Sequence, residues 1–353
     1  MGGPGSMARF LTHMTGALRS HGCEVIVLGA RELEDAQRNN AVLRILGRLH
    51  VPWLLIYWAF VFDAWRAAGY PLIVVTSQEY VVPFAFSKQV PIYHDIIQYF
   101  YPRNRKSLLF YRYYLPWASR KMGFIYSVTN ATGRMINQVY GKLPYHICGV
   151  PIDRQFLSPV GEAPAGEHFE AVWVGTLAEH KHYQRVLNYV KDDVEGTGTV
   201  AMVVPRDSAP ILAREVEALQ LGKRIRVFTG LSDDELSSIY RRSDAVISTS
   251  DLEGFCMPVL EAALCGCRPV VPDRATFREN FGRFSVLVPP HGVAYGRYIK
   301  HAEARFERGE IMESAQAHDK VVRDRWSASM DEIAAAAIVG STGEIIRECG
   351  HFV

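Results

Sequence analysis

Two glutamates stand eight positions apart in the stretch DLEGFCMPVLEAALCGCRPVV, residues 251–271. Glu253 precedes a Gly-Phe pair and Glu261 follows Pro258, so we expect a turn and the start of a helix between the two acids. The backbone N–H groups at a helix start suit a phosphate, and paired carboxylates suit the hydroxyls of a ribose or a hexose. Together the two features predict a site for a nucleotide sugar.

Each acid also has a structural interpretation that involves no ligand. Glu261 is expected in the first turn of a helix that begins at Pro258 and ends at Gly266, where the helix dipole favours an acid. Glu253 taken alone is an ordinary solvated loop residue. The glycine turn beside the pair favours the binding interpretation, in which both carboxyl groups face one cleft.

The elements that must position these acids follow from short apolar runs that alternate with helix-like stretches. Such a pattern is typical of parallel sheets covered by helices on both faces. Four runs precede a linker rich in Pro and Gly at 149–170, and six follow it, so the predicted fold class is α/β with two Rossmann-like, doubly wound domains. Their ligand is expected in the cleft at the carboxyl ends of the strands. The predicted strands are 23–29, 71–77, 90–95, 122–129, 171–176, 198–205, 224–230, 244–250, 267–272 and 284–289.

The composition agrees with two globular domains. The chain has 353 residues, of which 48% are hydrophobic and 22% charged, and its net charge of +2 gives no reason to expect nucleic acid as a partner. Six cysteines form no Cys-x-x-Cys pair, so neither a zinc site nor another metal site is predicted. Reduced thiols in a cytoplasmic protein are the expected state.

Two segments bear on a membrane. The apolar run 51–62 is too short to cross a bilayer, which takes roughly 20 residues, and no secretory segment is seen, so a cytoplasmic location is expected. Residues 98–121 mix aromatic side chains with six Lys or Arg, which predicts a peripheral contact with the anionic inner face of the cell membrane. The alternatives are a core helix for 51–62 and a solvated basic helix for 98–121.

The stretch 253–271 resembles the Glu, seven residues, Glu signature of retaining glycosyltransferases of family four. That family has the GT-B fold, in which two Rossmann-like domains face each other across a cleft. Other segments are similar to the family in the same order, namely YHDI (93–96), SVTNATGRMINQVYG (127–141), GVPIDRQFLSP (149–159), VWVGTLAEHKHYQRVL (172–187), 226–250 and 271–280. The resemblance implies an acceptor-binding domain at 1–155, a nucleotide-sugar domain at 156–325 and a helical segment at 326–353 that crosses back to the first domain.

The resemblance also implies a reaction. A sugar would pass from a UDP- or GDP-linked donor, with retention of configuration and without a metal or other cofactor, to a glycan or lipid-linked acceptor of a surface polysaccharide, lipopolysaccharide or glycolipid. Glu253 would meet the sugar hydroxyls, Lys181 would balance the diphosphate and His94 would align the acceptor, while Glu261 would hold the ribose. The other implied substrate-binding residues are Gly254, Phe255, Cys256, Met257, Gly2, Gly3, Thr176, His180, Arg206 and Ser250.

The sequence departs from the family at three points. Thr176 and His180 stand where arginine is common, so one fixed cation is missing unless His180 or Arg206 supplies it. Cys256 replaces a common glycine, which we interpret as a packing variant and not as a nucleophile. The family opens with a strand before the glycine-rich turn, and here Gly2 and Gly3 stand at the start, with that strand missing. A nucleotide-sugar 2-epimerase of the same fold and a non-catalytic module that binds nucleotide or membrane are the alternative functions.

Overall fold

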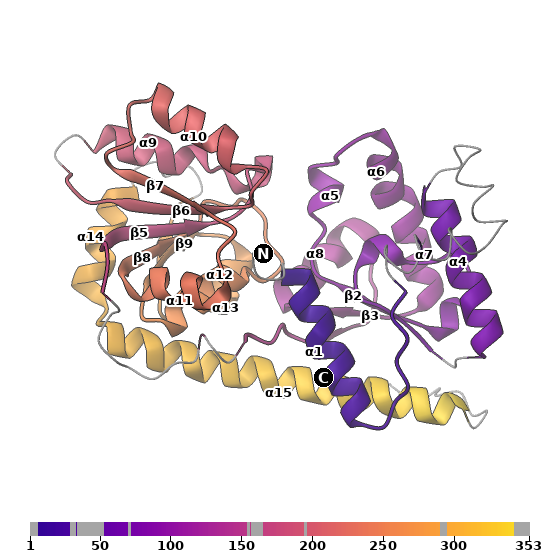
Figure 1. Cartoon of the computed structure of the whole chain (residues 1–353). Coiled ribbons are helices and arrows are strands. Elements are labelled where there is room, and N and C mark those ends of the chain that lie inside the picture. The colour runs from indigo at the N-terminus through magenta and orange to yellow at the C-terminus, as the bar shows by residue number, and fades with distance from the viewer. Residues whose placement is uncertain are drawn as a thin grey trace.

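The structure is a computed structural model that describes residues 6–28, 33, 53–69, 72–153, 156, 165–193, 196–289 and 295–341. Two parallel sheets, each flanked by helices, form two domains, and the helix α15 (Arg308–Ser341) runs along both of them (Figure 1). Every strand pair within these ranges is parallel. The predicted α/β class is therefore confirmed.

The first domain holds a sheet with the order β1-β2-β3-β4. Its strands are β1 (Ile73–Val75), β2 (Gln89–Tyr93), β3 (Ile125–Ser127) and β4 (Tyr145–Ile147), of which β4 was not predicted. The prediction of a strand at 23–29 is wrong for residues 23–28, which form no ladder with the described strands and line an apolar cavity together with β1. The helices of this domain are α1 (Ser6–Ser20), α4 (Trp53–Ala68), η1 (Gln78–Tyr80), η2 (Phe86–Lys88), α5 (Ile97–Phe100), α6 (Arg105–Leu109), the π-helical η3 (Phe110–Tyr114), α7 (Leu115–Met122) and α8 (Asn130–Tyr140).

The second domain holds a sheet with the order β10-β9-β8-β5-β6-β7. All six strands predicted there form, as β5 (Phe169–Val174), β6 (Val200–Val204), β7 (Ile225–Thr229), β8 (Ser243–Ile247), β9 (Arg268–Pro272) and β10 (Val286–Val288). Because β5 and β8 are neighbours although distant in sequence, the loops after them meet at the carboxyl edge, where ligands of such sheets bind. The helices are η5 (Glu179–Lys181), α9 (Gln184–Asp192), α10 (Ala209–Ala218), α11 (Asp233–Arg241), α12 (Met257–Leu264), α13 (Ala275–Phe281) and α14 (Tyr295–Arg305).

The helix α12 carries the second glutamate. It begins at Met257, one residue before Pro258, and Gly266 follows its end with a φ of +88°. Glu261 therefore lies in the second turn, not in the first as predicted. Since the dipole acts within the first turn, it does not account for an acid at this position.

Helix α15 joins the two domains. It packs against α12 in the second domain and against α1 and β4 in the first. The Trp326 ring lies 5.0 Å from that of Phe10, and the Tyr126 hydroxyl donates to Glu332 at 2.8 Å. The helix is continuous from Arg308 to Ser341 and runs along both domains (Figure 1).

The apolar run at 51–62 belongs to α4. Ile56, Tyr57 and Val61 are buried, whereas Leu55 and Phe62 are exposed, so one face of the helix is core. Within the described ranges, no helix is both long and apolar enough to cross a bilayer.

Candidate active site between the two domains

The loop after β8 brings Glu253 to a lysine. Glu253 is only 8% exposed, which contradicts the interpretation of a solvated loop residue, and its carboxylate forms an ion pair with the Nζ atom of Lys181. Lys181 ends η5, which follows the neighbouring strand β5. Burial lowers the pKa of Lys181, but the groups around it, Glu253 first and then Cys256 and Asp95, together raise the pKa overall. The lysine is therefore charged, and Glu253 is its counterion.

His94 approaches this loop from the first domain. A side chain on Gly254 would collide with the carbonyl oxygen of His94, so only glycine fits at that point. The Nε2 atom of His94 lies 2.9 Å from the carbonyl oxygen of Thr76, and burial lowers the pKa of His94 to about 4. Because a carbonyl only accepts, the neutral ring carries its proton on Nε2, and Nδ1 is left as an acceptor.

Asp95 is a site residue that the sequence reasoning missed, although the His-Asp pair after a strand was the signal for it. The pKa of Asp95 is raised to about 6, mainly by burial and to a smaller extent by the nearby charge of Glu253, although a hydrogen bond from the Ile97 amide at 2.8 Å opposes the rise. The carboxyl group therefore titrates closer to neutral pH than an ordinary aspartate does.

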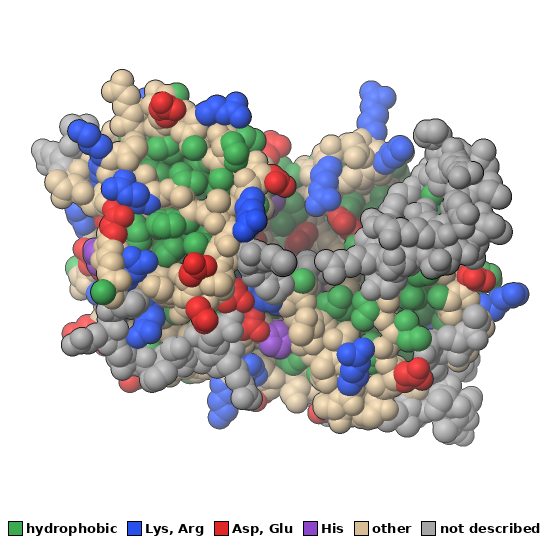
Figure 2. All heavy atoms as spheres, viewed as in Figure 1, with side chains coloured by type: hydrophobic (Ala, Val, Ile, Leu, Met, Phe, Trp, Pro, Cys, Tyr) green, Lys and Arg blue, Asp and Glu red, His purple; other side chains and the backbone are tan. Residues whose placement is uncertain are grey.

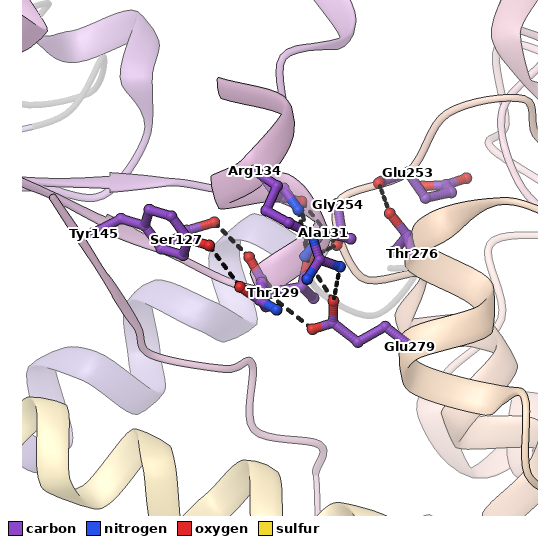
Figure 3. Close-up of polar contacts among 11 residues, drawn as sticks. Ser127, Thr129, Ala131, Arg134, Tyr145, Glu253, Gly254, Thr276 and Glu279 are labelled. Atoms are coloured by element: carbon purple, nitrogen blue, oxygen red, sulfur yellow. Dashed lines mark hydrogen bonds and ion pairs between the residues drawn. The ribbon is translucent and has the colours of Figure 1, made fainter. Parts of the chain in front are cut away.

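Hydrogen bonds across the domain boundary hold the Glu253 loop (Figure 3). The carbonyl oxygen of Gly254 accepts from Thr129 at 2.9 Å and from Thr132 at 3.2 Å, and that of Glu253 accepts from Thr276 at 2.8 Å. Since the two threonines belong to the start of α8 and Thr276 to α13, both domains fix the loop. None of these partners was predicted, because they are distant in sequence from the loop.

Glu261 has different partners from Glu253. It is 1% exposed, its carboxylate lies 3.0 Å from a guanidinium nitrogen of Arg9 in α1, and the Tyr240 hydroxyl donates to it at 3.3 Å. Arg9 also reaches Asp233 at 3.4 Å and Asp153 at 3.5 Å. Burial raises the pKa of Glu261 to about 7, although Arg9 opposes the rise. In this structure each of the two acids is thus buried against its own cation.

The loop after β5 carries the predicted phosphate contacts. Thr176 is exposed, and the half-buried His180 lies with its ring 5.9 Å from that of Tyr101. Burial lowers the pKa of His180, so its ring is neutral at pH 7 and does not replace the missing cation. Arg206 is exposed and lies against Gly230 at the end of β7, which β5 and β6 separate from β8.

A charge cluster that was not predicted lies beside this loop. Asp251 accepts from His182 at 2.5 Å, Arg274 at 2.9 Å and Arg185 at 3.3 Å, and its amide donates to the carbonyl of His180 at 2.9 Å. Burial raises the pKa of Asp251, but these cations, Arg274 first, lower it overall. The cluster ties the loop after β5 to the loop after β8.

The residues at the start of α12 offer backbone groups and not side chains. The Phe255 ring packs on Phe281 with 6.2 Å between centroids, and Met257 and Ser250 are buried. Cys256 has a φ of 70°, in the left-handed region, which explains why glycine is common at this position. Burial raises the pKa of the Cys256 thiol, as expected for an inert cysteine. Gly2 and Gly3 lie outside the described residues.

The surface between the two domains is hollowed on the face shown in Figure 2. In the part of the chain that the structure describes, no three His, Cys, Asp or Glu side chains are grouped so as to hold a metal ion.

Comparison with known proteins adds a family match. Residues 160–302 match the family "Glycosyl transferases group 1". The chain is 37% identical over 72 residues to tRNA-queuosine alpha-mannosyltransferase of Drosophila melanogaster, which covers 20% of this chain and 19% of that protein. It is 20% identical over 217 residues to the O-antigen chain mannosyltransferase RfbU of Salmonella typhimurium, which covers 62% of this chain and 61% of the relative. The chain thus spans less than two thirds of the length of each of these two relatives.

Two solved structures share the fold. Sucrose-phosphate synthase from Thermosynechococcus elongatus superposes with a TM-score of 0.63 at 16% identity, over 83% of this chain and 78% of that one. HepE from Anabaena, in complex with UDP and glucose, superposes with a TM-score of 0.60 at 17% identity, over 83% of this chain and 82% of that one. The chain has the GT-B fold of two Rossmann-like domains, as predicted.

Proposed function

We propose that this chain is a retaining glycosyltransferase that uses a nucleotide sugar as donor. The observation that carries the proposal is the buried Lys181–Glu253 pair next to the start of α12, opposite His94 of the other domain. A diphosphate needs a cation and N–H donors, and a sugar needs hydroxyl acceptors. Lys181 provides the cation and the start of α12 the N–H donors for the diphosphate, and Glu253 provides the acceptor for the sugar hydroxyls. The family match of residues 160–302 supports this assignment.

In the proposed reaction, the bond between the anomeric carbon and the diphosphate breaks as the acceptor oxygen bonds to the same face of that carbon. The acceptor proton passes to the departing phosphate oxygen. Negative charge grows on the diphosphate, where Lys181 and the helix start stabilise it, so the proposal requires no divalent ion. His94 is neutral and has an acceptor at Nδ1, which suits a hydrogen bond from a sugar or acceptor hydroxyl. Glu261 is proposed to bind the ribose once Arg9 has moved away from it.

We propose UDP- or GDP-linked hexoses as donors and a glycan or lipid-linked acceptor of a surface polysaccharide or glycolipid. The names of the mannosyltransferase relatives make GDP-mannose the first donor to test. The exposed side chains Leu109, Tyr113 and Trp117, beside the basic residues of α6 to α7, suit peripheral binding to the cytoplasmic face of an anionic membrane.

The test measures release of UDP or GDP from a panel of nucleotide sugars, with and without EDTA. We expect slow release from one donor, unchanged by EDTA, and a loss of at least about 100-fold in Lys181→Ala and in Glu253→Gln, because charge compensation and sugar binding are removed. Lys191→Ala, at an exposed lysine of α9, is the matched control and should retain full activity.

A second pair of variants tests the contact between the domains. Gly254→Ala should abolish release because its methyl group collides with the backbone of His94, whereas a methyl group on Gly222 meets no atom within 4 Å and Gly222→Ala should be active. Calorimetry that finds nucleotide bound without release from any donor would support a non-catalytic binding module. A changed configuration at C2 of the unconsumed donor would support the epimerase.

A further inference from the structure

The side chain of Arg9 reaches from the first domain into the second. Helix α1 lies at the boundary between the two domains (Figure 1), and the Nη2 atom of Arg9 is 3.0 Å from the Oε1 atom of Glu261 in α12. The side chain of Arg9 is 11% exposed and that of Glu261 is 1% exposed. Because the two groups enclose each other, another partner reaches the Glu261 carboxylate only when Arg9 leaves it.

The contact between Arg9 and Glu261 is close, but it is poorly hydrogen-bonded. The Oε1 atom of Glu261 and the Nε atom of Arg9 are both buried, and neither forms a hydrogen bond with a described group. The Tyr240 hydroxyl donates to the other carboxylate oxygen, at 3.3 Å. A buried carboxylate with an unused acceptor atom is costly, and the hydroxyls of a ribose are donors that suit it. Glu261 is therefore held by a partner that a ribose can replace.

Arg9 keeps other partners when it leaves Glu261. Its Nη1 atom lies 3.4 Å from a carboxylate oxygen of Asp233 and 3.5 Å from one of Asp153, whereas Nη2 makes the Glu261 contact. The guanidinium carbon also lies 5.8 Å from the centre of the Phe156 ring. Release from Glu261 therefore leaves the arginine paired with two acids, which avoids the large cost of a buried charge without a partner.

We propose, on the basis of the donor site proposed above, that Arg9 is an internal competitor of the nucleotide ribose. Without a donor, Arg9 occupies the Glu261 carboxylate and helps to hold the two domains together. The ribose hydroxyls displace it, and Arg9 stays paired with Asp153 and Asp233. Part of the binding free energy of the donor breaks this contact. Because the contact forms again when the nucleotide leaves, it favours release of the nucleoside diphosphate after transfer.

The test measures the Kd of nucleoside diphosphates by isothermal titration calorimetry. GDP and UDP are titrated into the wild type, and the nucleotide that binds more tightly is compared with its 2′,3′-dideoxy form. Arg9→Met removes the guanidinium group, and we expect it to bind the full nucleotide about tenfold more tightly, because Glu261 is no longer occupied. The dideoxy form should gain nothing, since it brings no hydroxyl to Glu261.

The matched control is Arg19→Met, at an exposed arginine near the other end of α1, which should leave both Kd values unchanged. Arg9→Lys is a second variant, for use if Arg9→Met does not fold. It keeps the charge but lacks the fork that contacts Glu261 and the aspartates together, so its gain should be smaller and in the same direction.

A double variant shows whether the effect passes through Glu261. Glu261→Gln removes the carboxylate, so adding Arg9→Met to it should change neither Kd. A gain that persists in the double variant would overturn the proposal. Equal gains for the full and dideoxy nucleotides would do the same, because they would show that Arg9 acts through its volume. Weaker binding of both nucleotides by Arg9→Met would instead identify Arg9 as a ligand of the diphosphate.

Failure of the donor site gives a different result from failure of the competition. If the folded wild type and all variants bound neither GDP nor UDP, the proposed donor site would be wrong, and the role of Arg9 with it. If the wild type bound the full nucleotide more tightly than the dideoxy form, and Arg9→Met did so with the same Kd values, the donor site would stand. In that case only the competition by Arg9 would be refuted.

Discussion

At the scale of single residues, the two glutamates differ in what burial does to them. Glu253 has a lysine within ion-pair distance, and the side chain of that lysine, Lys181, keeps 20% of its surface exposed. Glu261 is almost fully enclosed, and its pKa of about 7 shows that burial outweighs the attraction of Arg9. Ionisation of Glu261 therefore costs stability, even though a guanidinium lies beside it.

This imbalance predicts a pH effect on stability. The folded state holds the Glu261 proton up to about pH 7, whereas the unfolded chain releases it near pH 4.5, so the free energy of unfolding falls as the pH rises through this window. Glu261→Gln removes the titration and leaves Asp153 and Asp233 as partners of Arg9. We expect the variant to gain a few degrees in Tm relative to the wild type at pH 8 and little at pH 5, measured by scanning calorimetry.

The control is Glu313→Gln, at an exposed glutamate of α15. The wild type, Glu261→Gln and Glu313→Gln all keep Asp95 with its raised pKa, so its effect on the pH dependence of stability cancels in the comparison. If instead the Tm of the wild type exceeded that of Glu261→Gln by a margin that grew from pH 5 to pH 8, the proposed effect of Glu261 on stability would be wrong.

At the scale of elements, the start of α8 is capped by the other domain (Figure 3). The Glu279 carboxylate of α13 accepts from the amides of Asn130 at 2.8 Å and Ala131 at 2.6 Å, and lies 3.4 Å from Arg134. A carboxylate at this end also faces the positive end of the helix dipole. Glu279 thus combines a helix cap with a contact between domains.

We expect Glu279→Ala to cost about 1 kcal/mol in unfolding free energy and to increase the radius of gyration in solution scattering, because the cap and the contact are lost together. Glu235→Ala is the matched control. Glu235 closes a capping box on α11 with Ser232, inside one domain, so its loss should cost a similar free energy without opening the molecule. Equal radii for the two variants would show that Glu279 does not hold the domains together.

The elements also show what the sequence could and could not predict. All six strands of the second domain were predicted because continuous apolar runs such as 200–204 are buried on both faces. The run at 23–28 is also largely apolar but pairs with no strand in the part of the chain that the structure describes, and β4 was missed because its three residues are only half-buried. Glu253 and Glu261 were predicted from their local spacing, and Lys181 from the family resemblance. Arg9 and Glu279 were not, because their roles depend on contacts more than 100 residues away in sequence.

At the scale of the whole molecule, α15 binds both domains along one helix. Its Asp331 lies 2.6 Å from His21, and Glu332 accepts from Tyr126, both in the first domain. The other half of the helix packs on α12 of the second domain. Between them, Trp326 packs against Phe10 of α1 and is 8% exposed. A helix that shares its contacts in this way makes the unfolding of each domain depend on the other.

Trp326→Ala should therefore do more than lower the stability. Removing a buried tryptophan costs about 3–5 kcal/mol, and the loss falls on the contact between α15 and α1. We expect scanning calorimetry to change from one transition to two, with the first domain unfolding at the lower temperature. Val321→Ala changes an exposed side chain, 45% accessible, on the same helix and should shift Tm by less than about 2 °C. A single transition in Trp326→Ala, merely moved to lower temperature, would mean that the linker and the Glu279 contact are enough to couple the domains without α15.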